Sequence, residues 1–318
     1  MRYNKLEYNV ACFLSSVSLF LGIGFNRIIQ DAGSDSLISI VIGFFIGLFI
    51  IWIMKRFDSK EIKVLKFIYS FVLLGISIFL ITNMISSIYL NNTPDFIVMV
   101  PYLILLYYVI TNEKNMLFRV CSILFYLYVI IAAVPIFTLG PNINVDHFMP
   151  MFSNETSNIL YSAFKYAIIS TSPLILFPDF KDNYSYKTYV CSSILTLIIF
   201  AIVIGNLGVD LAKIYRYPEY MVFKNIALLG FIENIQNILS YLWIISSFTV
   251  SSFASYSIKE VTSKKVFLGL LIVILIVFCK IFLNNYIYTQ FLINYYIWIL
   301  GGCILLYIIS KFCLKNKN

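Results

Sequence analysis

Residues 37–54 read LISIVIGFFIGLFIIWIM, a run of 18 positions without a charged residue. A helix that crosses a bilayer needs about 20 mostly apolar residues, because the hydrocarbon core is about 30 Å thick and each residue rises 1.5 Å. A second such run extends from Val266 to Cys279. Over all 318 residues, 61% are hydrophobic and 12% are charged, whereas a soluble domain carries about 25% charged residues. The chain is therefore predicted to be an all-α membrane protein, and the lack of short apolar alternation argues against a β-barrel.

Apolar runs separated by charged, Gly, Pro or Asn clusters predict about ten spans in one transmembrane domain, 1–318. Residues 210–230 are too mixed to cross the membrane and are expected to form a loop and a short helix outside its core. The predicted spans are 9–29, 36–54, 64–90, 95–111, 117–138, 158–178, 188–208, 232–257, 266–284 and 287–310.

The distribution of positive charge predicts the orientation. If the N-terminus is cytoplasmic, 17 of the 23 Lys and Arg residues fall in inside segments, and only Arg27, Lys213, Arg216 and Lys224 fall outside. Cytoplasmic loops of membrane proteins are enriched in Lys and Arg. We therefore expect an integral protein of the cell membrane, with both termini in the cytoplasm.

Two spans contain residues that interrupt helices. The first contains Gly22-Ile23-Gly24, and the sixth contains Ser170-Thr171-Ser172-Pro173. A proline removes a backbone donor and crowds the carbonyl four residues earlier. Broken helices at the membrane midplane form the substrate sites of transporters with inverted repeats. If residues 9–138 and 158–310 are five-plus-five inverted repeats, these breaks correspond, and we expect a ligand site between them.

Each break also has a structural interpretation. The two glycines can simply permit close helix packing, and hydroxyls before a proline often only cap a kink. Lys165, about one and a half turns before the break that begins at Ser170, is a possible coupling group, because a charge within the membrane is expensive; alternatively, its ammonium reaches the outer surface. Glu233 is expected to cap the helix that follows it.

Other functional classes receive little support. The charge of +8 is better explained by cytoplasmic loops than by nucleic-acid binding. The six cysteines are scattered, without a CxxC or Cys/His cluster, so no metal or cofactor is expected. His147 is the only histidine, and no paired carboxylates accompany it. We therefore do not expect an enzyme.

Several segments, in this order along the chain, resemble the GerAB-type spore germination receptor B subunits, endospore germination permeases of the amino acid–polyamine–organocation superfamily. The span-eight block is the most specific. The matching segments are Gly22-Ile23-Gly24, Asp35-Ser36-Leu37-Ile38-Ser39, Leu176-Phe177-Pro178-Asp179-Phe180-Lys181, Tyr217-Pro218, Gly230-Phe231-Ile232-Glu233-Asn234 and Trp243-Ile244-Ile245-Ser246-Ser247-Phe248.

The resemblance implies a LeuT-like fold with helices 1 and 6 broken, and a subunit that binds a nutrient, expected to be an amino acid, and acts with partner A and C subunits. An amino-acid transporter coupled to protons or Na⁺ is the alternative. The family often has Gly-x-Glu in the span-six break, where this chain has Ser170 and Ser172, and Asn234 replaces an Arg after Glu233. The acidic group that would face a ligand's ammonium is therefore missing from this motif.

Overall fold

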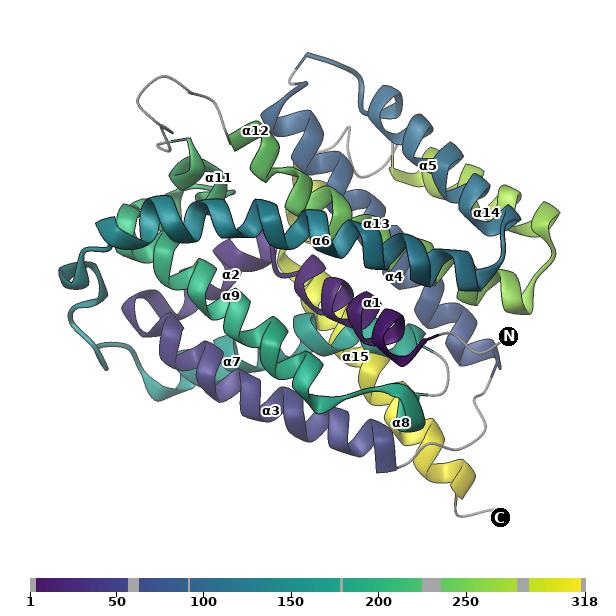
Figure 1. The fold of residues 1–318 in the computed structure, drawn as a ribbon, viewed down its shortest axis with the longest axis horizontal. Helices are drawn as coiled ribbons and strands as arrows, with labels where there is room; N and C mark the ends of the chain where they lie inside the picture. Colours follow the sequence, from purple (N-terminus) through teal and green to yellow (C-terminus); the bar gives the residue numbers. More distant parts are fainter. Residues whose placement is uncertain are drawn as a thin grey trace.

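The computed structural model describes residues 4–56, 63–90, 92–177, 180–224, 236–278 and 286–315 (Figure 1). Within these ranges every regular element is helical. The α-helices are α1 Lys5–Ser18, α2 Ile23–Ala32, α3 Ser36–Arg56, α4 Lys63–Ile88, α5 Asp95–Thr111, α6 Lys114–Leu139, α7 Thr156–Thr171, α8 Phe180–Asn183, α9 Tyr186–Leu207, α10 Val209–Ile214, α11 Pro218–Phe223, α12 Gln236–Leu239, α13 Tyr241–Val261, α14 Lys264–Val277 and α15 Tyr286–Lys315. The 3₁₀ turns are η1 Gly33–Asp35, η2 Gly140–Asn142, η3 Val145–Phe148 and η4 Ser172–Leu176.

Seven helical stretches in the described part of the chain are long and apolar enough to cross a membrane. They are Ile23–Arg56, Lys63–Ile88, Lys114–Asn142, Thr156–Leu176, Tyr186–Leu207, Asn237–Val261 and Tyr286–Phe312. The prediction of an all-helical membrane protein is confirmed. The count of ten stays a prediction, because the first expected span is divided between α1 and α2, α5 has 17 residues, and α14 has 14 described ones.

The polarity of the bundle is inverted relative to a soluble protein. Large apolar side chains of α6 such as Ile123, Ile130 and Phe137 are well exposed. In contrast, α13 buries a series of hydroxyls: Ser246, Ser247, Thr249, Ser251, Ser252, Ser255 and Ser257. Such hydroxyls can bond their own helix, as Ser246 does to the Leu242 carbonyl at 2.7 Å. Small residues inside and apolar residues outside are typical of helices that pack together within lipid.

Two close helix pairs organise the interior. Helix α13 packs along α4 and also contacts α1 and α6. Helix α3 packs along α7, side by side at the lower left of Figure 1. Gly43 permits this second contact, because a Cβ there would lie 2.5 Å from the Ala163 carbonyl oxygen.

The last turn of α3 and the first turns of α4 and α6 lie at the end of the bundle where both termini lie (Figure 1), and they carry Lys55, Lys66 and Lys114. Lys55 donates to the Tyr184 carbonyl at 2.6 Å, and Lys66 and Lys114 both pair with Glu260. The charge alternation assigns all three lysines to the cytoplasmic side. Their shared location agrees with that assignment, which stays a prediction because the structure contains no membrane.

Candidate functional site

The first helix break is built around Gly22. Helix α1 ends at Ser18, residues 19–22 form a turn, and α2 begins at Ile23. Gly22 has φ +79°, a conformation that side chains with a Cβ rarely adopt. A Cβ at this position would also touch the Tyr217 ring at 3.4 Å. The break therefore depends on glycine here for its backbone conformation.

A glutamate from a distant segment caps this break. The Gly22 N–H donates to Glu219 Oε1, although the two residues are 197 positions apart. Glu219 lies on α11 and is fully buried, and its Oε2 has no hydrogen-bond partner among the described residues. Burial raises the pKa of Glu219 to about 8, against the opposing effects of its own amide, the Gly22 amide and the Trp243 indole. The first amides of a helix lack intrahelical acceptors, so this carboxyl occupies a natural anion position.

The segment that carries Glu219, residues 208–223, is fastened over the break. Asn26 on α2 is buried, and its side-chain amide donates to the Ala212, Lys213 and Tyr215 carbonyls, the last at 2.7 Å. On the other side, Tyr217 Oη donates to Asn83 Oδ1 of α4 at 3.0 Å. The 208–223 segment therefore closes this region by contacts to both α2 and α4.

A small cavity lies beside the break. It measures about 20 Å³, which is about the space that one water molecule needs. An amino acid does not fit in this arrangement. The walls of the cavity come from the end of α1, the break itself, the start of α2, and from α4, the 208–223 segment and α13. The lining residues are Ser18, Leu21, Gly22, Ile23, Leu80, Ile81, Met84, Tyr217, Trp243 and Ser247.

Gly24, the second glycine of the motif, lies in a tightly packed position. A Cβ on Gly24 would clash with the Leu19 carbonyl oxygen and would lie 3.1 Å from Tyr296 Oη. The packing interpretation therefore accounts for this glycine. Gly22 and Gly24 are thus distinct, since only Gly22 has the positive φ and the amide bound to Glu219.

The hydroxyls of the second break bond mainly their own helix, and two tyrosines from other helices add to them: Tyr69 Oη donates to the Ser172 carbonyl, and the Tyr189 hydroxyl bonds Ser170 Oγ at 2.8 Å. Ser170 and Thr171 donate to the Ala167 carbonyl, and Ser172 donates to the Ile169 carbonyl at 3.3 Å. Pro173 then follows within the 3₁₀ turn η4. None of these four residues lines the cavity beside Gly22. The structure therefore does not bring the two predicted halves of the site together around one space.

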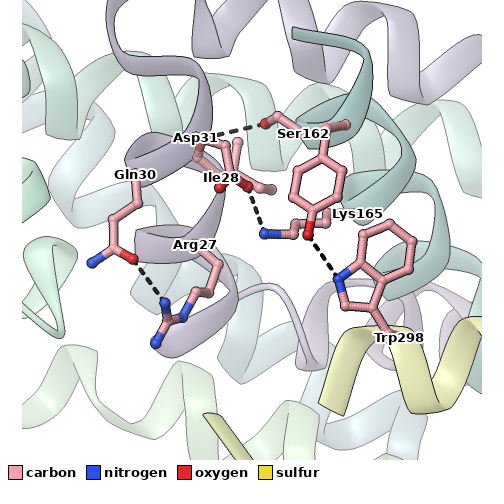
Figure 2. Close-up of polar contacts among 8 residues, drawn as sticks. Arg27, Ile28, Gln30, Asp31, Ser162, Lys165 and Trp298 are labelled. Atoms are coloured by element: carbon pink, nitrogen blue, oxygen red, sulfur yellow. Dashed lines mark hydrogen bonds and ion pairs between the residues drawn. The ribbon is translucent and has the colours of Figure 1, made fainter. Parts of the chain in front are cut away.

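Lys165 is paired with a carboxylate. Figure 2 shows its Nζ pointing to Asp31 Oδ2 on α2, at 2.6 Å. Its side chain is only 6% exposed, and its ammonium lies 4.4 Å from the centre of the Tyr161 ring. The Tyr161 hydroxyl in turn accepts from the Trp298 indole at 3.1 Å (Figure 2). Lys165 thus joins α7 to α2 through a largely buried ion pair.

The other predicted residues form no second site within the described residues. Glu233 lies outside the described residues, so its predicted capping role is untested. Within the ranges described, no three His, Cys, Asp or Glu side chains could hold a metal ion. A cavity of about 520 Å³ lies among loop residues beyond α2 and α9, with His147, Asp210 and Lys213 in its wall.

Glu219 and Asp31 are the polar residues that sequence reasoning missed. Tyr217-Pro218 belongs to the family resemblance, but nothing local indicates that the adjacent Glu219 reaches the first span. Asp31 is four positions after Arg27, in what reads as an outer turn. The sequence offered only a general indication of these two residues: an acidic side chain near a membrane segment is expected to have a partner.

Comparison with known proteins identifies the family. A family model described as spore germination protein, the spore permease family, matches residues 13–291, which is most of the chain. No curated protein matches the sequence. The matched range includes both helix breaks, the 208–223 segment and the Lys165–Asp31 pair. Because the match spans most of the sequence, the chain belongs to the spore germination protein family of membrane permeases.

Proposed function

We propose that this permease is the membrane-embedded nutrient-binding subunit of a spore germinant receptor and that it binds a small amino acid at the Gly22 break. The observation that supports this most is the Gly22 amide, which already holds a buried carboxyl at the start of α2. The N-terminus of a helix favours anions through its free N–H groups and its dipole. The carboxylate of an amino acid is the ligand group that matches this position.

In this proposal Gly22, Ile23 and Gly24 supply the backbone that meets the ligand. Ser170, Thr171, Ser172 and Pro173 belong to the other side of the site and contribute only after α7 and η4 reorient, because their hydroxyls now bond within α7. The small cavity agrees with a closed arrangement of the site. Ligand binding must therefore favour a second, more open arrangement.

The proposed architecture has ten crossings, in two inverted five-helix repeats with cytoplasmic termini in the spore inner membrane. The interruptions after Ser18 and after Thr171 support it, because they fall in the first span of each proposed repeat. A ligand triggers germination only by binding one state of the bundle more tightly than another. Partner A and C subunits would detect that change of state.

Germination of spores that carry Gly22→Leu together with Thr171→Val tests the proposal. We expect the double variant to lose its response to amino acids, and its protein level in the spores is measured alongside because Gly22→Leu also destabilises the fold. Gly302→Leu is the matched control, because Gly302 is exposed and a Cβ added there would meet nothing within 4 Å. An unchanged response in the double variant would rule out this site.

Transport of amino acids, coupled to protons or Na⁺, is the second candidate. The buried Lys165–Asp31 pair between α2 and α7 favours it, because such a pair can carry a proton when helices move apart. Uptake of labelled amino acids by proteoliposomes that contain only this chain would support transport. Uptake that is insensitive to Lys165→Gln would argue against proton coupling through this pair.

A further inference from the structure

The Glu219 carboxyl lies where the proposed ligand's carboxylate would bind. We propose that Glu219 is an internal occupant of this carboxylate position, and that a small carboxylate-bearing ligand binds by displacing it from the Gly22 amide. This inference rests on the proposed function and adds the chemical group that the site recognises. It also adds the residue that keeps the site closed.

The geometry requires a displacement. The Gly22 N–H already donates to Glu219 Oε1, and one amide hydrogen cannot serve two carboxylates well. The cavity beside it has room for about one water molecule. A ligand that reaches this amide must therefore move the Glu219 side chain away, because the described residues around the cavity leave too little volume for both.

Glu219 is also poorly satisfied where it lies. Its Oε2 is buried without a hydrogen-bond partner among the described residues, and an unpaired buried polar atom is unfavourable. Burial raises its pKa to about 8, so at neutral pH the carboxyl is mainly protonated. A neutral acid gains less from the helix N-terminus than an anion does. When displaced into water, the acid loses its proton to the solvent.

The backbone of the 208–223 segment is held by more contacts than the Glu219 carboxyl is. Asn26 bonds three carbonyls of the segment, and Tyr217 bonds Asn83 of α4. In the part of the chain that the structure describes, the Glu219 side chain is met from outside its own helix by the Gly22 amide and the Trp243 indole, both of them donors that a ligand's carboxylate can also use. Rotation of that one side chain can therefore open the position before the segment itself moves.

Rescue by an external carboxylate tests the inference with the purified full-length protein in detergent at pH 7. Thermal unfolding of Glu219→Ala is measured in sodium acetate, and in sodium chloride or acetamide at matched concentration. We expect acetate alone to raise the unfolding midpoint of this variant by several degrees, in a saturable manner. Wild type, in which the position is filled, and Glu155→Ala, which removes an exposed carboxylate, should not respond.

Glu219→Ser is a second variant with the same expected acetate dependence. The inference is overturned if acetate stabilises neither variant, or if it stabilises wild type equally. It is also overturned if neither variant folds even in acetate. If a ligand can displace the Glu219 side chain, the protein must stay folded without that side chain whenever another carboxylate occupies its position.

A panel of the twenty common L-amino acids separates this inference from the proposed function. Any amino acid that stabilises wild type should stabilise Glu219→Ala at a concentration at least tenfold lower, because the competitor is gone, and its amide derivative should be inactive. Stabilisation of wild type without acetate rescue would overturn the inference alone. Acetate rescue with no response to any amino acid would support the carboxylate position and overturn the nutrient proposal.

Discussion

The two helix breaks of this permease differ in the number and chemistry of their partners. At the α7–η4 break, the hydroxyls of Ser170, Thr171 and Ser172 bond carbonyls of the same helix, and Tyr69 and Tyr189 add bonds from α4 and α9. At the α1–α2 break, the Gly22 amide is met by one carboxyl, that of Glu219, from a segment 197 residues away. A break held by several neutral hydroxyl bonds forms a stable kink, whereas an amide with one carboxyl partner can exchange that partner for a ligand's carboxylate.

The two breaks also differ in what their polar groups would gain from exposure to water. The hydroxyls at the second break are buried and bonded, so that opening them would only lose hydrogen bonds. Glu219 is buried with one oxygen unpartnered among the described residues, so that its release regains hydration. The first break is thus the better candidate for a conformational switch, and the following predictions test this contrast.

Gly22→Leu should have the largest effect. A side chain at φ +79° is strained, and the Tyr217 ring leaves no room for it, which together should destabilise the protein by about 3 kcal/mol. Thermal unfolding of the purified variant measures this, with Gly302→Leu as control, for which we expect little change. Equal effects of the two substitutions would mean that the first break is not a constrained site.

Lys165→Gln should have the next largest effect, because it removes the ammonium that pairs with Asp31 and so breaks the ion pair between α7 and α2. Removing one member of a buried pair is strongly destabilising, and since Asp31 is 23% exposed we expect a loss of about 2 kcal/mol. Combining it with Asp31→Asn should restore part of that loss. Additive losses in the double variant, measured by thermal unfolding, would show that the pair does not couple α2 to α7.

The pH dependence of stability should distinguish the first break from the second. The folded-state pKa of Glu219 is raised from 4.5 to about 8, so its contribution to stability is fully present below pH 4.5 and is lost as pH rises through 8. Between about pH 6.5 and 7.5 we expect a loss of about 1 kcal/mol.

Unfolding curves of wild type and Glu219→Gln across this range check the assignment. The Gly22 amide and the Trp243 indole act on the carboxyl, and the carboxyl and Arg216 in turn act on Tyr217. Burial raises the pKa of Tyr217, so that it stays neutral throughout. In Glu219→Gln the free energy of unfolding should no longer fall with pH over this range. If it still falls, another group causes the pH dependence.

Thr171→Val alone should have the smallest effect. It removes one hydroxyl that donates to the Ala167 carbonyl at 2.7 Å, while valine keeps the shape. The net value of such a bond is about 1 kcal/mol, and the carbonyl keeps its Ser170 contact. A loss of stability well above that value, or a large change in amino-acid binding, would show that the second break is not self-sufficient.

Much of the architecture could be predicted locally. Long uncharged runs such as residues 37–54 have no soluble alternative, and Gly22 and Pro173 mark the two helix breaks. A proline alone is not a sufficient signal, because Pro101 and Pro135 lie inside α5 and α6. The short helices α10 and α11 also fall largely within the stretch 210–230, whose mixed composition predicts no span. These features follow from composition and backbone chemistry over a few neighbouring residues.

The partners across the bundle could not be predicted, because they depend on how distant segments pack. Hydropathy places Glu219 and Asp31 in outer turns, and only the folded chain brings them to Gly22 and Lys165. The sequence by itself determined that the first span breaks at a glycine with a free amide. Tertiary structure decided that a buried carboxyl fills that position, since a helix end accepts whichever acceptor the packing delivers.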